Sequence, residues 1–204
     1  MKLGIHNLAL SIGDRRLLAG VDAMLEPGRI VAILGPAGSG KGALLRALAG
    51  RHDIDAGQVR LGGKLIGRYA RAERAKAILL VGARPGLFAR APDLASAVAA
   101  RPNWLLVEDP LSALDPAAQL DRIAQFRAAA GQGTGMVLTL ADPVLAARAA
   151  DDVLLLGRGR MLAFGPARAA LAHQNLREAF GIEVMVIGDE GGRLLPVPIG
   201  RADG

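Results

Sequence analysis

One short segment restricts the fold of this chain more than any other: a glycine-rich loop placed between a buried strand and a helix. The run from Ile30 to Leu34 is continuously apolar, which is typical of a strand covered on both faces of a mainly parallel sheet. Glycines follow directly, and a helical pattern runs from Ala43 to Leu48. Such a loop aims backbone N–H groups and a positive helix N-terminus at phosphate oxygens. The sequence therefore predicts an α/β fold with a phosphate-binding loop.

The loop follows the pattern G-x-x-x-x-G-K-[ST] at every position except the last, where glycine stands instead of Ser or Thr. The missing hydroxyl normally ligates the magnesium ion that bridges the β and γ phosphates of a nucleotide. We therefore expect phosphate contacts to survive and metal placement to suffer. The expected nucleotide-binding residues are Gly35, Pro36, Ala37, Gly38, Ser39, Gly40, Lys41 and Gly42.

Other interpretations of the loop fit less well. A turn without a ligand would not need Lys41 at the required spacing. Gly38, Gly40 and Ala43 also fit the dinucleotide pattern G-x-G-x-x-A, but no acidic residue follows at a second strand end about 20 residues on. A P-loop kinase or GTPase stays in reserve, and the chain lacks the Asn-Lys-x-Asp motif that reads guanine.

Buried apolar runs followed by helical stretches recur along the chain, which predicts α/β organisation. The runs are residues 78–81, 104–107, 136–140 and 153–156, and a long helical pattern covers residues 117–130. We expect one domain over residues 1–204. Its parts are an antiparallel β segment (1–29), a phosphate-loop core (30–157) and a C-terminal extension with a hairpin, a helix near 175–180 and short strands near 184–187 and 194–197 (158–204).

Composition excludes several classes of protein. Cysteine is absent, so there is no disulfide framework or thiolate metal site, and His6, His52 and His173 lie in unrelated segments. The net charge of +6 comes mainly from scattered arginines, and aromatic residues make up 3% of the chain, so we expect no nucleic-acid partner. No apolar stretch approaches the roughly 20 residues that cross a bilayer. We expect a cytoplasmic protein, either free or peripheral to a membrane.

A second motif brings a family into view. Residues 104–116, with the sequence WLLVEDPLSALDP, resemble the Walker B and D-loop segment of ABC-transporter ATPases. Residues 27–30, 56–63 and 158–165 are also similar to this family. Residues 74–75 and 175–182 are similar to the subunits that serve iron-siderophore, haem and cobalamin importers. The resemblance implies a P-loop NTPase core with a mainly parallel sheet and an N-terminal antiparallel β-subdomain.

The resemblance assigns roles to four residues, with one exchange. Glu108 stands where the family has its magnesium-associated Asp, and Asp109 stands where it has its general-base Glu; Ser112 and Asp115 fall in the D-loop. The exchange moves each carboxylate by about 1.5 Å, and a misplacement of about 1 Å costs on the order of a hundredfold in rate. The structural alternative is that these residues cap a strand end and shape the turn at Pro110.

Other family positions lack their expected side chains. Ala83 aligns with the Q-loop Gln, Ala141 with the switch His, and Ile12 with the aromatic residue that stacks on adenine. Only residues 89–103 lie where the family has a helical subdomain and the Leu-Ser-Gly-Gly-Gln signature. We therefore expect a fold similar to ABC ATPases with the helical subdomain deleted.

Two functions follow from the resemblance. The first is a degenerate ABC-type protein that binds ATP or ADP weakly, hydrolyses little or none, has a compromised Mg site, and acts on a partner. That partner would be a full-length ABC ATPase, another protein, or a second copy of this chain. The alternative is a working ATPase subunit of an iron-siderophore, haem or cobalamin importer.

Overall fold

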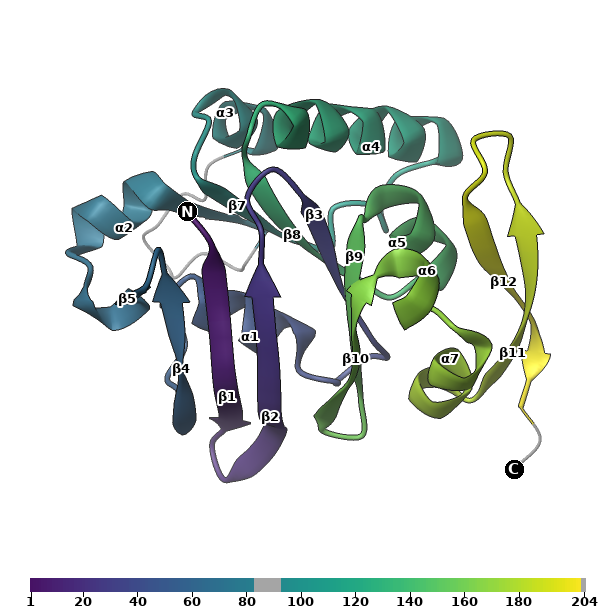
Figure 1. Cartoon of the computed structure of the whole chain (residues 1–204), viewed down its shortest axis with the longest axis horizontal. Helices are drawn as coiled ribbons and strands as arrows, with labels where there is room; N and C mark the ends of the chain where they lie inside the picture. The colour runs from purple at the N-terminus through teal and green to yellow at the C-terminus, as the bar shows by residue number, and fades with distance from the viewer. Residues whose placement is uncertain (83–92, 203–204) are drawn as a thin grey trace.

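The computed structural model describes residues 1–82 and 93–202, and within them ten strands form one continuous sheet (Figure 1). The strand order is β5-β4-β1-β2-β10-β9-β3-β8-β7-β6. Five neighbouring strands run parallel to one another, as the buried apolar runs predict. They are β9 (Asp152–Gly157), β3 (Ile30–Leu34), β8 (Gly135–Leu140), β7 (Trp104–Glu108) and β6 (Ile78–Val81).

The antiparallel part of the sheet combines segments from both sides of the phosphate loop. The hairpin of β1 (Leu3–Ile12) and β2 (Arg15–Leu25) is the expected N-terminal portion. It is extended by β4 (Ala56–Leu61) and β5 (Lys64–Leu65), which pair antiparallel to β1 and β4 and come after the loop in sequence. A single residue pair, Arg160 with Ala19, joins β2 to β10 (Arg160–Pro166) and makes the sheet continuous.

Helices cover both faces of the parallel strands. Helix α1 (Lys41–Leu48) packs on one face, and α4 (Pro116–Gly131) and α5 (Pro143–Ala149) pack on the other. The shorter helices are η1 (Ile66–Arg68) and α2 (Arg71–Ala77) before β6 and α3 (Leu94–Ala99) before β7. None of the helices in the described residues is long and apolar enough to span a bilayer.

The two hydrophobic clusters of the core share β3, whose side chains alternate between them as strand geometry requires. Val31 and Ile33 pack with α1 and with the antiparallel strands, while Ile30, Ala32 and Leu34 pack with α4 and α5. Helix α1 therefore lies between the parallel strands and the antiparallel part. That packing fixes where the loop before α1 points.

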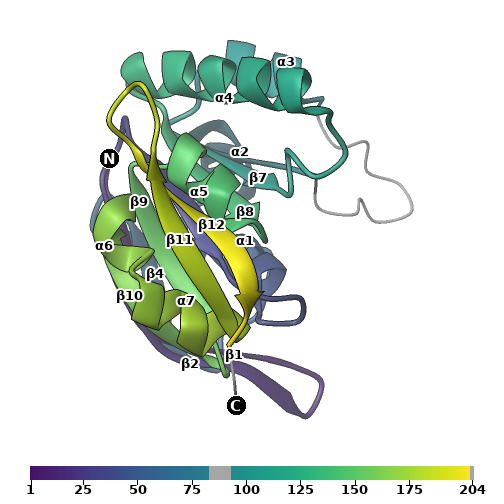
Figure 2. The same ribbon diagram turned by 90° about the vertical axis from the view of Figure 1, so that its right-hand side faces the viewer.

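The C-terminal extension lies against the α5 side of the core (Figure 2). It contains α6 (Ala167–Ala170), α7 (His173–Phe180) and a separate hairpin of β11 (Ile182–Gly188) and β12 (Leu194–Arg201). The helix and both strands confirm the sequence-based expectation, although the strands are longer than predicted. Leu176 and Leu195 are buried in the same cluster as α4 and α5, so the extension shares the core of the domain.

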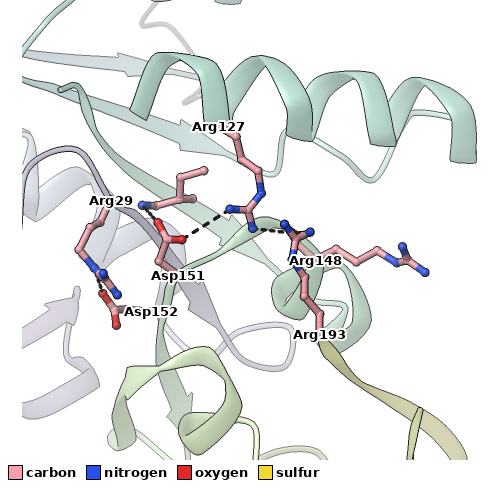
Figure 3. A network of polar contacts seen from close by, with 7 residues as sticks. Arg29, Arg127, Arg148, Asp151, Asp152 and Arg193 are labelled. Carbon is pink, nitrogen blue, oxygen red and sulfur yellow. Dashed lines mark hydrogen bonds and ion pairs between the residues drawn. The ribbon is translucent and has the colours of Figure 1, made fainter. Parts of the chain in front are cut away.

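A polar network around Asp151 ties several of these elements together (Figure 3). Its carboxylate accepts a hydrogen bond from the backbone N–H of Ile30 at 2.8 Å and pairs with Arg127 of α4 at 3.5 Å. Arg127 and Arg193 both donate to the carbonyl oxygen of Arg148, at 2.9 and 3.2 Å. Because Arg193 precedes β12, the network connects the start of β3 to α4, α5 and the C-terminal hairpin.

Candidate functional site

The glycine-rich loop connects the carboxyl end of β3 to the start of α1, and two of its glycines are required by its shape. Gly38 and Gly40 have φ values of 76° and 94°, in the left-handed region that residues with a side chain rarely adopt. A Cβ atom added at Gly40 would lie 2.8 Å from Cγ of Leu18. Backbone conformation and space together therefore demand glycine at position 40.

The loop places the N-terminus of α1 beside an open pocket, and no side chain caps this end of the helix. Gly40 is the N-cap residue, and no acidic residue occupies the first turn. The first N–H groups of a helix have no partner inside it and carry partial positive charge. This end of α1 is thus available to an anion.

Lys41 folds back over the loop. Its ammonium group donates hydrogen bonds to the carbonyl oxygens of Gly35 and Pro36, at 2.6 and 2.8 Å. Burial lowers the pKa of Lys41 below its ordinary value, and the charge of the Asp109 carboxylate opposes that shift. Ser39 is buried, and its hydroxyl has no hydrogen-bond partner among the described residues.

A pocket of about 460 Å³ opens beside the loop, within the size range of small-molecule sites. The phosphate loop and α1 form one wall, and the carboxyl ends of β7 and β8 form another. Leu17 and Ile12 from the N-terminal hairpin complete it. The lining residues are Ile12, Leu17, Ala37, Gly38, Ser39, Gly40, Lys41, Gly42, Ala43, Arg46, Glu108, Asp109, Thr139, Leu140 and Ala141.

Inside this pocket, Gly42, Glu108 and Arg46 meet in one place. A Cβ atom added at Gly42 would lie 2.5 Å from Oε1 of Glu108 and 3.2 Å from Nη1 of Arg46. The same two side chains form an ion pair of 3.5 Å. The Glu108 carboxylate therefore occupies the space that a Ser or Thr side chain at position 42 would need.

Asp109 is held by local contacts at the end of β7. Its φ of 48° is unusual for a residue with a side chain, and its backbone N–H donates to the hydroxyl of Thr139 at 2.9 Å. Its carboxylate accepts a hydrogen bond from the Ser112 hydroxyl at 2.7 Å. Asp115 caps α4 by accepting from the N–H of Ala118 at 2.9 Å. Asp109 and Ser112 thus have structural partners in the turn after β7, and Asp115 has one in the first turn of α4.

Two positions that the resemblance assigns to nucleotide contacts, the adenine-stacking residue and the switch His, carry small or aliphatic side chains at the pocket. Ile12 and Ala141 line the pocket, and Ile12 is 55% exposed there. Ala83, the predicted Q-loop position, lies outside the described residues. The three histidines stay apart from the pocket lining, and no group of three His, Cys, Asp or Glu side chains suited to a metal ion occurs in residues 1–82 and 93–202.

Sequence reasoning missed Arg46 and Thr139 as members of this site. Arg46 follows Gly42 by four residues, so the two share one face of a helix, and that spacing is the signal that identifies it. Thr139 is one of the few buried polar residues of the described chain, but only the pairing of β7 with β8 places it beside Asp109.

Comparison with known proteins agrees with the fold. The sequence profile of the ABC transporter family matches residues 18–136, more than half of the chain. A hemin import ATP-binding protein, HmuV, from Pseudomonas fluorescens (strain Pf-5) is 30% identical over 240 aligned positions, covering 90% of this chain and 94% of the relative. The HmuV protein of Hahella chejuensis is 28% identical over 254 positions, covering 96% of each.

Solved structures show the same fold at lower identity. The structure of an ATP-binding subunit of an ABC transporter superposes with a TM-score of 0.72 at 17% identity, covering 88% of this chain and 95% of that one. The structure of cbiO1 from Clostridium perfringens, part of the transporter complex cbiONQ, gives a TM-score of 0.71 at 16% identity and covers 85% and 92%.

Proposed function

Since this chain belongs to the ABC transporter family, we propose that it is a degenerate ATP-binding member. It binds ATP or ADP weakly at the phosphate loop, hydrolyses little or no nucleotide by itself, and acts by binding a partner protein. Its place would be the cytoplasmic side of a membrane, either free or bound to other subunits.

One observation carries this proposal: the pocket keeps the backbone groups that bind phosphate, while positions 42 and 141 offer it no polar side chain. The exposed N-terminus of α1 and the ammonium group of Lys41 supply phosphate contacts. Position 42 has no hydroxyl, and Ala141 offers no group to contact a γ-phosphate. Phosphoryl transfer depends almost entirely on such positioning and electrostatic groups, so their loss affects hydrolysis more than binding.

The aligned lengths support a missing segment. The alignment with the Pseudomonas relative is 240 positions long but includes only 90% of this chain, which is about 184 of its 204 residues. About 56 positions of that relative therefore have no counterpart in this chain. The connection from β6 to β7 spans only residues 82–103, with α3 as its described helix. A missing helical subdomain would remove the signature that closes the nucleotide site of an opposing subunit.

Titration calorimetry with ATP and with ADP tests nucleotide binding. We expect weak but measurable affinity that Lys41→Ala reduces strongly, because the ammonium group lies at the phosphate end of the pocket. Arg168→Ala, at an exposed position on α6 outside the pocket lining, serves as the charge-matched control and should bind like the unchanged protein. Equal affinity for Lys41→Ala and the unchanged protein would refute the assignment of the phosphate loop.

A second candidate function is a working ATPase subunit of an importer for haem or a related metal chelate. The observation in its favour is that relatives covering nearly the whole chain are hemin import ATP-binding proteins. Phosphate release separates the candidates. Turnover that depends on magnesium and rises when a cognate permease is added would establish the importer role, whereas the degenerate protein should release no phosphate above the rate of the Lys41→Ala variant.

A further inference from the structure

The site does not fit the magnesium ion that the family uses, and the reason lies in the arrangement of three residues. Mg²⁺ requires oxygen ligands at about 2.0–2.1 Å in near-octahedral geometry. In P-loop proteins one of these is the hydroxyl after the lysine. Here that residue is Gly42, and the space of its missing side chain holds the carboxylate of Glu108 with the guanidinium of Arg46 beside it.

The end of the Glu108 side chain fills the space beside Gly42. Gly42 lies in α1 and has no positive φ, so the backbone itself would accept a side chain. The obstacle is the carboxylate, since a Cβ atom 2.5 Å from Oε1 of Glu108 is closer than real side chains approach. A residue with a side chain at position 42 would push Glu108 away from Arg46. The carboxylate of Glu108 and a side chain at position 42 thus compete for one space.

Arg46 brings a permanent positive charge to this place. A guanidinium offers five N–H donors and no acceptor, and it stays protonated. It would repel a divalent cation while binding phosphate oxygens, often through two parallel hydrogen bonds. About one third of the Arg46 side chain is exposed, and it lines the pocket together with Lys41. Its contact with Glu108 holds the guanidinium at the pocket wall.

We propose that Arg46, positioned by Glu108, supplies the positive charge for the β and γ phosphates, so that nucleotide binds without a metal ion. This inference rests on the proposed function, because it requires that nucleotide enters the pocket at all. The protein would then bind ATP or ADP at a site where the Arg46 side chain replaces the metal cation.

The experiment compares ATP affinity by titration calorimetry in excess magnesium and in excess EDTA. For the unchanged protein we expect the two affinities to agree within about threefold. Arg46→Ala should weaken binding in EDTA roughly tenfold, the effect of losing a hydrogen bond to a charged group. Arg46→Lys should recover only part of this loss, since it keeps the charge without the planar fork. Arg168→Ala should leave both affinities unchanged.

Two variants at position 42 distinguish the effect of filling the space beside Glu108 from the effect of adding a metal ligand. Gly42→Ala adds only the Cβ atom, so it should displace Glu108 and weaken binding in both buffers. Gly42→Ser combined with Glu108→Asp supplies a hydroxyl and shortens the acid, and should make binding stronger in magnesium than in EDTA by tenfold or more. Circular dichroism and thermal melting of each variant would show that it is folded.

Two results would overturn the inference. One is a strong magnesium requirement of the unchanged protein that Glu108→Gln abolishes, which would make Glu108 itself a metal ligand. The other is full affinity of Arg46→Ala in EDTA. Failure of the proposed function has a different appearance: no ATP binding in either buffer, or binding that Lys41→Ala leaves intact.

Discussion

Replacing Asp151 by alanine tests whether its polar network holds the C-terminal extension to the core. One carboxylate oxygen accepts the backbone N–H of Ile30 at 2.8 Å, and the other pairs with Arg127 at 3.5 Å. The substitution leaves the N–H at the start of β3 without its acceptor. It also leaves Arg127 next to Arg193 without the anion that offsets their charges.

The structure gives an approximate size for this effect. A hydrogen bond to a charged group contributes about 1.5–3 kcal/mol. The ion pair adds less than about 1 kcal/mol, because both side chains are about one third exposed and their atoms are 3.5 Å apart. We expect Asp151→Ala to lower the free energy of unfolding by about 2–3 kcal/mol. At roughly 2–4 °C per kcal/mol for a domain of this size, Tm should fall by about 5–10 °C.

Urea unfolding followed by circular dichroism measures this free energy. Asp151→Asn keeps an oxygen that can accept from Ile30 and loses the charge, so it should lose about half as much stability. Asp121→Ala, at an exposed position on α4, is the matched control and should change stability by less than about 0.5 kcal/mol. A loss below about 0.5 kcal/mol for Asp151→Ala would show that the network does not stabilise the domain.

Three further predictions concern the pocket and its partners. Gly40→Ala should weaken ATP binding more than tenfold in calorimetry, because alanine is strained at a φ of 94° and its Cβ atom meets Leu18; unchanged affinity would contradict the loop geometry. On the proposal that the docking segment is missing, the chain should fail to co-purify in detergent with a permease encoded beside it, and stable co-purification would refute this. A fully repaired chain should still release no substantial phosphate alone, because a partner's signature must close the site; robust turnover would reveal an equivalent loop. The repair comprises Gly42→Ser, Ala83→Gln, Ala141→His, Glu108→Asp and Asp109→Glu.

The sequence alone predicted the parallel strands, the loop and three helices of the described residues, α1, α4 and α7. Those features are local: a continuous apolar run predicts a buried strand, and glycines with a lysine at fixed spacing predict the turn into α1. The resemblance to ABC-transporter ATPases identified residues 104–116 as the segment that brings two acids to the end of a strand. The sequence could not show that β4 and β5 complete the antiparallel part, because pairing with β1 depends on how the chain folds back around α1.

Tertiary structure decided how the site residues meet. The sequence places Gly42 and Arg46 on one helix face, but only the packing of α1 against β7 brings Glu108 to 2.5 Å from the missing Cβ atom. Similarly, the register of β7 with β8 gives Asp109 its contact with Thr139. Glu108 has one methylene more than Asp, and this extra length decides which space its carboxylate fills. The segments that surround that space are far apart in the sequence. The physical reason is that helices and strands form from local sequence preferences. The chemistry of the site depends instead on which side chains come into contact when those helices and strands pack together.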